Sequence, residues 1–558
     1  MKRSFLLLFA LLTALTATAQ KNHNFEVAKN LDIFNALYKE LDLSYVDTLD
    51  AEKNIGNAIL YMLNQLDPYT EFYKEDDAKD LKQLTTGKYA GIGSPIVYRK
   101  QEDRCIFSDP YENMPAARAG VRTGDVIMAI DGKDVGPCGS RDPGEYSSAV
   151  SAALRGEPGT TFELTVKRPT LSAPLVFKLT RENIKQPSVP FSKLMDDSIG
   201  YVALTGYTEN TARELRLAIA DLRRLGARRL VLDLRGNPGG LLREAVEIVN
   251  FFIPKGREVV RTEGKLPEQG MAYKTEEEPL DTHIPLVVLV DYGTASAAEI
   301  TSGALQDYDR AVIVGQRTYG KGLVQEPREL PYNTFMKLTT SKYFIPSGRC
   351  IQAYDFKNRN ADGQPRHLPD SLSRLFHTAA GRPVRDGGGI TPDVCIEPDS
   401  LPGLVTYLQL SDALFDWCVR YRNTHDSIAA PADFHLTDAE MDDFRKYVKQ
   451  SDFTYDRRSK SLLDLLRKVA ADEGYADEAK AEFDALEKKL SHDLDDDLAR
   501  WQTEVRRVVE AEIVADYYHD RGAIEYQLPY DKDLQEAVAI LRDDARYRAL
   551  LAAPAGKE

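Results

Sequence analysis

The stretch "IPLVVLVDYGTASAAEITSGALQDY", residues 284–308, shows how the central part of this chain is built. Its first half is a continuous apolar run, which is typical of a strand buried on both faces of a sheet. Its second half has a small residue at nearly every position before Glu299 and then continues as a helix. Ser296 lies where the strand gives way to the helix. It is therefore either a cap at a tight turn or a nucleophile held at a helix N-terminus.

The same strand–helix pattern recurs on both sides of this stretch, across residues 185–400. The expected elements are a strand at 199–207, an amphipathic helix at 211–226, a buried strand and glycine turn at 227–240, a helix at 241–252 and a strand at 311–315. Repeated units of this kind predict an α/β core with largely parallel strands. The strand before Ser296 should neighbour the strand at 311–315, because sequential strands of such sheets commonly do.

The two ends of the chain have a different character. Residues 1–19 combine a cationic start, an apolar run and small residues at Ala17 and Ala19, which predicts a signal peptide and an exported, periplasmic or otherwise extracytoplasmic protein. The alternative is an uncleaved anchor, although the run is short for a membrane span. Residues 25–86 have helical spacing, and so do residues 401–558, which we interpret as a helical appendage for packing or assembly.

Composition excludes several classes of function. The chain has 558 residues, enough for several domains, and its formal net charge of −15 argues against a nucleic-acid partner. Five cysteines lack CxxC spacing and eight histidines are dispersed, so we expect no metal site and no cofactor. We expect no integral membrane span after signal cleavage.

Residues 87–168 consist of short β runs and glycine turns, including "YAGIG" (89–93) and "PAARAGVRTGDVIMAIDG" (115–132). This region resembles a PDZ domain, with "YAGIG" at the position of the carboxylate-binding loop. The resemblance implies that a peptide C-terminus adds to a sheet edge and meets main-chain N–H groups of the loop. The predicted binding residues are Tyr89, Ala90, Gly91, Ile92 and Gly93. The alternative is a small β module used only for packing.

A serine nucleophile needs a base. His283 precedes the strand and would lie at its far end from Ser296, whereas Lys321 follows the strand at 311–315 in "GQRTYGKGLVQ". Loops that follow parallel strands open at the same edge of the sheet. A lysine base would need its pKa lowered by about three units from about 10.4, which desolvation can supply. Gln325 could then hold the amine without adding negative charge.

Acyl transfer also needs donors for the developing oxyanion. The N–H of Ala297, at the start of the helix, is one candidate, and an N–H at Gly239 or Gly240 is the other. Both lie at strand-to-helix turns, where free N–H groups and the helix dipole favour negative charge. Each feature alone has a plain structural explanation, as a cap, a surface lysine or a glycine turn, and only the ordered set indicates chemistry.

That set resembles the C-terminal processing (tail-specific) serine peptidases that carry a PDZ domain. The motifs are "TASAAEI" (294–300), "TYGKGLVQ" (318–325), "DLRGNPGG" (233–240) and "AILYMLNQLDPYTEFY" (58–73). The resemblance implies a crotonase-like α/β core with an inserted PDZ domain, and a Ser296/Lys321 dyad supported by Gln325. Thr294 departs from the serine that the family often has there, and no motif matches the region after residue 400.

The resemblance further implies an endopeptidase that cleaves unfolded or tail-tagged proteins with apolar C-termini, and it allows a homo-oligomer. Two alternatives stay open from the residues alone. One is a non-catalytic PDZ scaffold that keeps a relic core, and the other is a different acyl hydrolase built on the same core.

Overall fold

The computed structural model describes residues 2–74, 88–360, 362–398, 401–490 and 493–553, with residues 2–22, 88, 89 and 458 described by their backbone alone. Residues 75–87 therefore lie outside the described part, and with them the end of the predicted N-terminal segment and the start of the predicted PDZ region. The chain divides into two compact units. The first comprises residues 1–76 and 325–339, and the second comprises 77–324 and 340–558.

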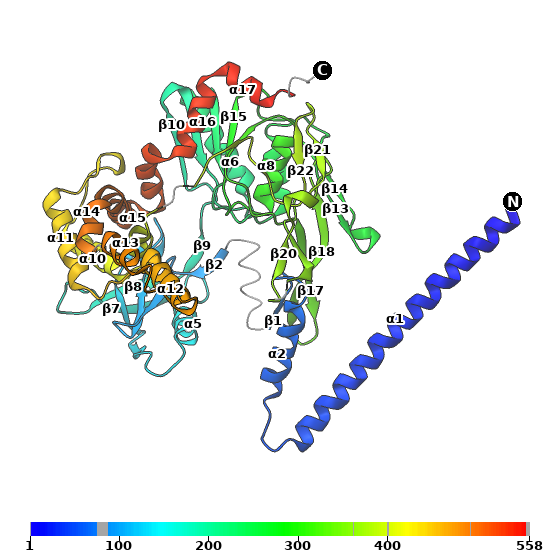
Figure 1. Ribbon diagram of the computed structural model, residues 1–558, viewed down its shortest axis with the longest axis horizontal. Helices are drawn as coiled ribbons and strands as arrows, with labels where there is room; N and C mark the ends of the chain where they lie inside the picture. The colour runs from blue at the N-terminus through cyan, green and yellow to red at the C-terminus, as the bar shows by residue number, and fades with distance from the viewer. Residues whose placement is uncertain (1, 75–87, 361, 399–400, 491–492, 554–558) are drawn as a thin grey trace. The chain divides into compact units, whose positions relative to one another are not determined.

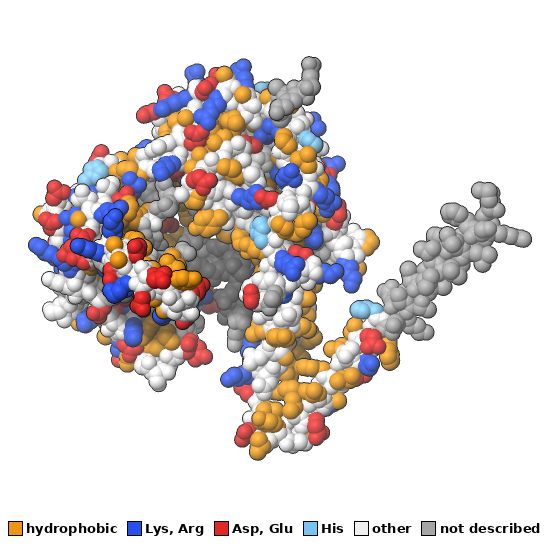
Figure 2. Space-filling view, in the orientation of Figure 1, with side chains coloured by type: hydrophobic (Ala, Val, Ile, Leu, Met, Phe, Trp, Pro, Cys, Tyr) orange, Lys and Arg blue, Asp and Glu red, His pale blue; other side chains and the backbone are white. Residues whose placement is uncertain are grey.

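The first unit is a helical segment with a small piece of sheet. Its elements are α1 (Lys2–Ser44), α2 (Ala51–Asn64), β1 (Glu71–Tyr73), most of β17 (Leu323–Leu330) and the first half of β18 (Thr334–Phe344). Asp50 begins α2 by accepting the N–H of Lys53, and β1 pairs antiparallel with β18. Figure 2 shows many apolar side chains exposed over α2 and over α1 from residue 25 onward. No helix among the described residues is long and apolar enough to cross a membrane.

The second unit is built on a six-stranded sheet, with strand order β10-β11-β12-β15-β16-β23. Figure 1 labels β10 and β15 of this sheet. The strands are β10 (Phe191–Met195), β11 (Ile199–Ala203), β12 (Arg229–Asp233), β15 (Leu286–Val290), β16 (Val312–Gly315) and β23 (Val394–Cys395). All neighbouring pairs are parallel except β10 with β11. The predicted parallel core is confirmed, and so is the predicted pairing of β15 with β16.

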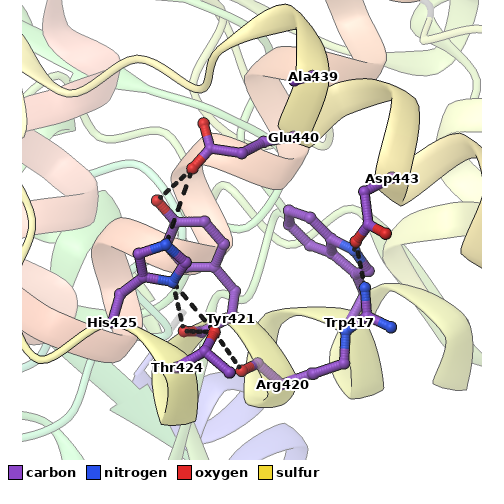
Figure 3. A pocket seen from close by; sticks show the side chains of 8 residues that line it. All are labelled: Trp417, Arg420, Tyr421, Thr424, His425, Ala439, Glu440 and Asp443. Atoms are coloured by element: carbon purple, nitrogen blue, oxygen red, sulfur yellow. Dashed lines mark hydrogen bonds and ion pairs between the residues drawn. The ribbon is translucent and has the colours of Figure 1, made fainter.

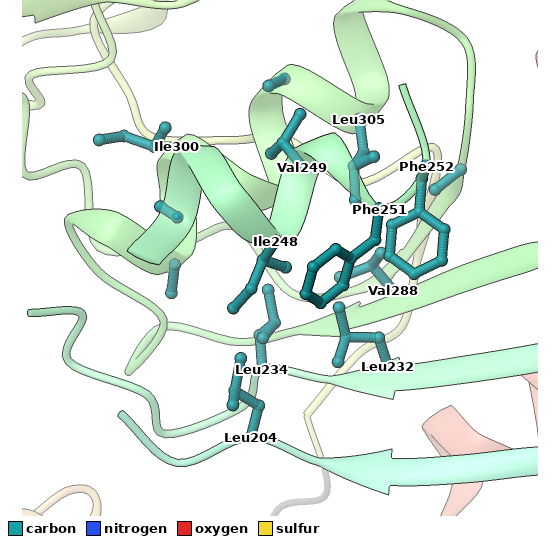
Figure 4. Packing of buried hydrophobic residues seen from close by; sticks show 14 of the residues in the cluster. Leu204, Leu232, Leu234, Ile248, Val249, Phe251, Phe252, Val288, Ile300 and Leu305 are labelled. Carbon is teal, nitrogen blue, oxygen red and sulfur yellow. The ribbon is translucent and has the colours of Figure 1, made fainter. Parts of the chain in front are cut away.

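Helices from between the strands cover one face of this sheet. They are α6 (Thr211–Arg224), α7 (Leu242–Asn250) and α8 (Ala297–Asp307). Figure 4 shows Leu232 and Val288 of the sheet packed against Ile248, Phe251 and Leu305 of the helical layer, all of them buried. Because successive side chains of a strand alternate, the neighbouring residues of these strands point to the opposite face.

That opposite face is covered by the last helices of the described chain, α16 (Lys532–Arg542) and α17 (Asp544–Leu551). Leu534 and Ile540 of α16 pack with Val231, Val287 and Leu289 of the sheet in one buried cluster. The sequence predicts only a helical appendage for packing or assembly over residues 401–558. The structure instead makes them the second layer of the core, because a buried parallel sheet needs cover on both faces.

The predicted PDZ region forms its own sheet and core. The sheet has the order β3 (Ile96–Arg99), β4 (Arg104–Phe107), β5 (Val126–Ile130), β7 (Thr161–Lys167), β8 (Leu175–Thr180), with β6 (Lys133–Asp134) beside β5. The helices are α4 (Pro115–Ala119) and α5 (Pro143–Leu154), and α5 packs beside β3. A separate pair, β2 (Lys88–Gly91) with β9 (Glu182–Lys185), joins the two ends of the region.

Helices fill most of the chain after residue 400. They are α9 (Gly403–Gln409), α10 (Asp412–Thr424), α11 (Asp438–Gln450), α12 (Arg458–Asp472), α13 (Lys480–Leu490), α14 (Leu494–Arg500) and α15 (Gln502–Gln527). This helical region docks on the PDZ region through Arg99 of β3, whose guanidinium donates to Asp416 of α10 at 2.8 Å. The mixed α/β fold class, with a helical N-terminal segment and a helical C-terminal region, is confirmed.

Short strands complete the second unit. They are β13 (Glu258–Gly264), β14 (Ala272–Lys274), β19 (Tyr354–Arg359), β20 (Pro365–His367), β21 (Leu375–His377) and β22 (Pro383–Arg385). The end of β18 pairs with β13. All five cysteines are free thiols.

Candidate active site

Ser296 lies at the turn between β15 and α8, as predicted. Its backbone has φ 55° and ψ −117°, a conformation that costs energy for any residue other than glycine. Its N–H donates to the carboxylate of Glu299 at 2.9 Å. Its carbonyl oxygen accepts from the hydroxyl of Tyr343 at 3.2 Å. The strained turn is thus held on both sides.

Glu299 joins this turn to the loop that carries Lys321. Its side chain is fully buried, and it accepts hydrogen bonds from the N–H groups of Gly320 at 2.7 Å and Lys321 at 2.9 Å. The hydroxyl of Thr318 donates to the same carboxylate. Burial raises the pKa of Glu299 to about 7, against the hydrogen bonds from Thr318 and the main chain, which lower it. Ser296 and Lys321 are therefore tied to one buried carboxylate.

The role of Glu299 was not predicted, although its position gave a signal. A glutamate three residues after a serine at a helix start is the pattern of a capping box. In that pattern the glutamate carboxylate accepts a hydrogen bond only from the main-chain N–H of the residue that caps the helix. Here the same carboxylate also reaches the next loop along the sheet, which depends on tertiary packing.

The Lys321 loop is fixed to the Ser296 turn by further contacts. The N–H of Tyr319 donates to the carbonyl of Thr294 at 3.0 Å. The hydroxyl of Tyr343 donates to the carbonyl of Lys321 as well as to that of Ser296. Both loops follow adjacent parallel strands, so the structure brings Ser296 and Lys321 to the same edge of the sheet, as predicted.

The glycine turn after β12 lies directly against Ser296. Gly239 has φ +91°, and a Cβ atom added to it would lie 2.7 Å from the Ala295 oxygen, the Ala297 nitrogen and the Ser296 Cβ. Only glycine permits this approach. Gly240 has φ +142° and approaches the main chain of Tyr207 instead. The carbonyl oxygen of Tyr207 would lie 2.2 Å from a Cβ atom added to Gly240.

Asn237 adds a feature that the sequence did not indicate. It is fully buried, and its Nδ2 donates to the carbonyl of Leu204 at 2.7 Å, which fixes the orientation of the amide. Its Oδ1 accepts the N–H of Gly239 at 2.9 Å. Of the two predicted glycine donors, Gly239 therefore already has a hydrogen-bond partner. The N–H of Gly240 forms no hydrogen bond within the described part of the chain.

Gln325 belongs to the first unit, whereas Lys321 belongs to the second. The Nε2 of Gln325 donates to the Thr339 hydroxyl at 3.2 Å, and that hydroxyl donates to Asp67 at 3.2 Å. Asp67 also accepts the N–H of Thr70 at 2.8 Å. The side chain of Gln325 is thus positioned by the segment that contains the "LDPYT" turn, and its action on Lys321 stays a prediction.

The predicted peptide-binding residues lie at the start of the PDZ region. Tyr89, Ala90 and Gly91 are in β2, and Ile92 and Gly93 follow directly. Gly93 has φ +71°, and an added Cβ would lie 2.4 Å from the Met114 Cβ. Beyond this turn, β3 is the edge strand of the sheet and runs beside α5. An edge strand next to a helix is the arrangement that strand addition requires.

A pocket of about 240 Å³ lies elsewhere, in the helical region (Figure 3). Its polar groups pair among themselves. Asp443 accepts from Trp417 Nε1 at 2.9 Å and pairs with Arg420, and Glu440 accepts from the Tyr421 hydroxyl at 3.2 Å. No side chain of the candidate active site lines it. Across the described residues, no cluster of histidine, cysteine and carboxylate side chains could hold a metal ion.

Comparisons with known proteins agree with this arrangement. The description "Peptidase family S41" matches residues 198–358, "PDZ domain" matches 106–168, and "Probable PDZ-protease, C-terminal helical domain" matches 404–541. The family match at 404–541 concerns the region for which the sequence motifs had given no counterpart.

Named peptidases are similar to this chain in sequence. The carboxy-terminal-processing protease of Bartonella bacilliformis is 35% identical over 349 residues, which cover 62% of this chain and 78% of that protein. A probable CtpA-like serine protease of Staphylococcus aureus is 34% identical over 332 residues, 59% of this chain and 64% of that one. A solved photosystem II D1 C-terminal processing protease is 28% identical, covers 65% of this chain and 86% of its own, and has a TM-score of 0.35. The similarity to the Bartonella bacilliformis protein and the two domain matches show that the chain belongs to the C-terminal processing serine peptidases of family S41, and that it carries a PDZ domain.

Proposed function

We propose that this peptidase uses Ser296 as its nucleophile and Lys321 as its general base, and that it cleaves unfolded or tail-tagged exported proteins. The observation that carries the proposal is the buried carboxylate of Glu299, which binds the N–H groups of both residues. The side chains of Ser296 and Lys321 come from two different loops, and catalysis needs them at a fixed separation. A carboxylate that binds the main chain of both loops provides that positioning.

In this mechanism, neutral Lys321 takes the proton of the Ser296 hydroxyl as the oxygen attacks the scissile carbonyl carbon. The resulting ammonium then gives its proton to the leaving amine, and the C–N bond breaks to leave an acyl-enzyme. Lys321 next takes a proton from the attacking water, and hydrolysis of the ester returns the proton to Ser296. Gln325 would hold the lysine amine without a negative charge that would raise its pKa.

The oxyanion of the tetrahedral intermediate would accept the N–H of Ala297 and a glycine N–H. The close approach of Gly239 to Ser296 and Ala297 supports this placement. The N–H of Gly239 would first have to leave Asn237, whereas that of Gly240 has no such hydrogen bond to break. We therefore favour Gly240 as the second donor, with Gly239 as the residue whose missing side chain makes the room.

Substrate selection would come from the PDZ domain. A protein C-terminus would extend the sheet at β3, with its apolar last side chain between β3 and α5 and its carboxylate at the N–H groups of Ile92 and Gly93. The signal-peptide pattern at residues 1–19 supports export, with the periplasm as the proposed compartment. No cofactor is needed for this chemistry.

The test is digestion of an unfolded protein with and without an apolar C-terminal tail, by the parent enzyme, Ser296→Ala and Lys321→Ala. We expect the parent to cut the tailed substrate faster and both variants to lose at least roughly 10³-fold in rate. Activity should rise with pH as Lys321 loses its proton. Cleavage that persists in Ser296→Ala would show that another residue is the nucleophile. A parent that binds the tail without cutting would favour the scaffold alternative.

A further inference from the structure

One partly buried charge cluster connects the C-terminal helices of the second unit with the glycine turn beside Ser296. At its centre is Arg235, which follows β12 and precedes Gly239 by four residues. The Nε of Arg235 donates to Asp233 at 3.0 Å. Its Nη1 donates to Asp531 at 2.9 Å and to Asp533 at 3.2 Å. The two aspartates come from the start of α16, almost 300 residues further along the chain.

The geometry of this cluster is specific. Arg235 binds Asp531 through Nη1 and Nη2 together, a two-point contact that fixes orientation as well as distance. The side chains are largely shielded, with Arg235 21% exposed, Asp531 15% and Asp533 12%. Burial lowers the pKa of the Arg235 guanidinium, but the neighbouring carboxylates outweigh it and hold that pKa above its ordinary value. The cation is therefore permanent.

The α16 side of the contact is anchored. Asp531 also begins α16, because its Oδ1 accepts the N–H of Leu534 at 3.0 Å. Leu534 itself is buried in the cluster that joins α16 to the core sheet. Asp531 thus cannot shift without moving the helix that covers one face of the sheet.

The loop side leads to the reacting groups. The residue after Arg235, Gly236, donates its N–H to Asp291 at 2.8 Å. Asn237 then holds Gly239, and Gly239 lies against Ser296 and Ala297. A displacement of Arg235 would be transmitted through a short, hydrogen-bonded stretch to the proposed oxyanion donors. A shift of about 1 Å at such donors can cost about 100-fold in rate.

We propose that Asp531 and Asp533 are positioning residues for the oxyanion loop, so that α16 belongs to the support of the catalytic site. The inference rests on the proposed function, because it assumes that the turn at 236–240 receives the oxyanion. The competing explanation is that these aspartates only attach the C-terminal helices to the core.

The chain offers a matched control for that explanation. Lys193 of β10 pairs with Glu525 at the end of α15 at 2.7 Å. This ion pair also joins the core sheet to the C-terminal helices, but it touches no residue of the glycine turn. Removing its charge tests attachment without disturbing the oxyanion loop.

The experiment compares Asp531→Asn, Asp533→Asn and their double variant with Glu525→Gln in the full chain. Asparagine is a good helix cap, so Asp531→Asn keeps the start of α16. We expect the double variant to lose roughly 10-fold to 100-fold in kcat with KM within about twofold. A peptide aldehyde, whose tetrahedral adduct places an oxygen at the oxyanion site, should bind the double variant more weakly by a similar factor. Glu525→Gln should keep the parent kcat.

The outcomes separate the two proposals. If the parent cleaves but the double variant has the parent kcat and aldehyde affinity, the inference is wrong and the proposed function stands. Equal losses in kcat for the double variant and Glu525→Gln would mean that attachment alone matters, which also overturns it. If the parent enzyme cleaves nothing, or if Ser296→Ala still cleaves, the proposed function fails first. Should the double variant not fold, the comparison of Asp533→Asn with Glu525→Gln decides in the same way.

Discussion

Replacing Gly239 by alanine tests the geometry of the site most directly. Two separate costs follow from the structure. The first is conformational, because φ is +91° and an L-residue in the left-handed region loses about 1 kcal/mol or more. The second is steric, because the new methyl group would lie 2.7 Å from Ser296 Cβ, Ala295 O and Ala297 N, whereas ordinary contacts begin at 3.4 Å. Relief requires a retreat of about 0.7 Å by atoms next to the proposed nucleophile.

Gly236→Ala is the matched control in the same loop. Gly236 has φ +65°, so alanine there has a similar conformational cost, but an added Cβ meets no atom within 4 Å. Both variants should bear the conformational cost of about 1 kcal/mol, seen as a small decrease in Tm for Gly236→Ala, and the steric cost should lower the Tm of Gly239→Ala further. Only Gly239→Ala should lose kcat/KM, by roughly 100-fold, because only that methyl group displaces Ser296 and Ala297.

The assay is cleavage of an unfolded protein with an apolar tail, with Tm measured on the same preparations. Near-parental activity of Gly239→Ala would refute the placement of the glycine turn against Ser296. Equal losses of activity in the two variants would show that backbone strain in the loop, rather than the collision, controls the site.

Three further changes test other parts of the structure. Burial raises the pKa of Glu299 to about 7. The contribution of this group to folding stability is therefore full below its ordinary pKa of 4.5 and is lost as pH rises through about 7. Between pH 4.5 and 7, the free energy that protects α8 from hydrogen exchange should fall by about 3 kcal/mol more in the parent than in Glu299→Gln. A difference between the two proteins that stays constant with pH would contradict this. Burial and a neighbouring carboxylate likewise raise the pKa of Asp516 of α15 to about 7. The contribution of Asp516 to folding stability is therefore full below pH 3.8 and is lost as pH rises through about 7. Asp516→Asn should raise Tm more at pH 8 than at pH 5, measured by the fluorescence of Trp417 and Trp501. An equal rise in Tm at both pH values would refute this. Arg99→Ala removes a charged hydrogen bond between the PDZ domain and α10, and should lower the free energy of unfolding by about 2 kcal/mol in urea titrations; an unchanged midpoint would contradict it.

The sequence allowed the meeting of Ser296 and Lys321 to be predicted for a definite reason. Buried strands of a parallel sheet are continuous apolar runs, and β15 and β16 are both followed directly by small and polar residues. Once two such strands are neighbours, the loops after them must open at one edge. Chain direction and strand order then determine which loops lie next to each other, without any knowledge of side-chain packing.

Other features depend on packing that no local pattern contains. The spacing of Leu534, Ala537 and Ile540 predicts an amphipathic helix but does not indicate which surface it covers, and it covers the core sheet. The engagement of Gly239 by Asn237 depends on one side-chain orientation in a buried turn. Three of the four hydrogen bonds accepted by Glu299 come from a loop that lies about twenty residues further along the chain.

The position of α16 has a consequence for the order of synthesis. The strands β10 to β16 leave the ribosome well before residues 532–541, with the whole helical region of 403–527 between them. Until α16 is made, Val231, Val287, Leu289 and Val312 form an apolar face without its cover. Apolar surface exposed in this way makes a partly synthesised chain prone to aggregate. A core that needs α16 as its cover can close only after the whole chain has been made, so the proposed active site would be complete only at the end of synthesis.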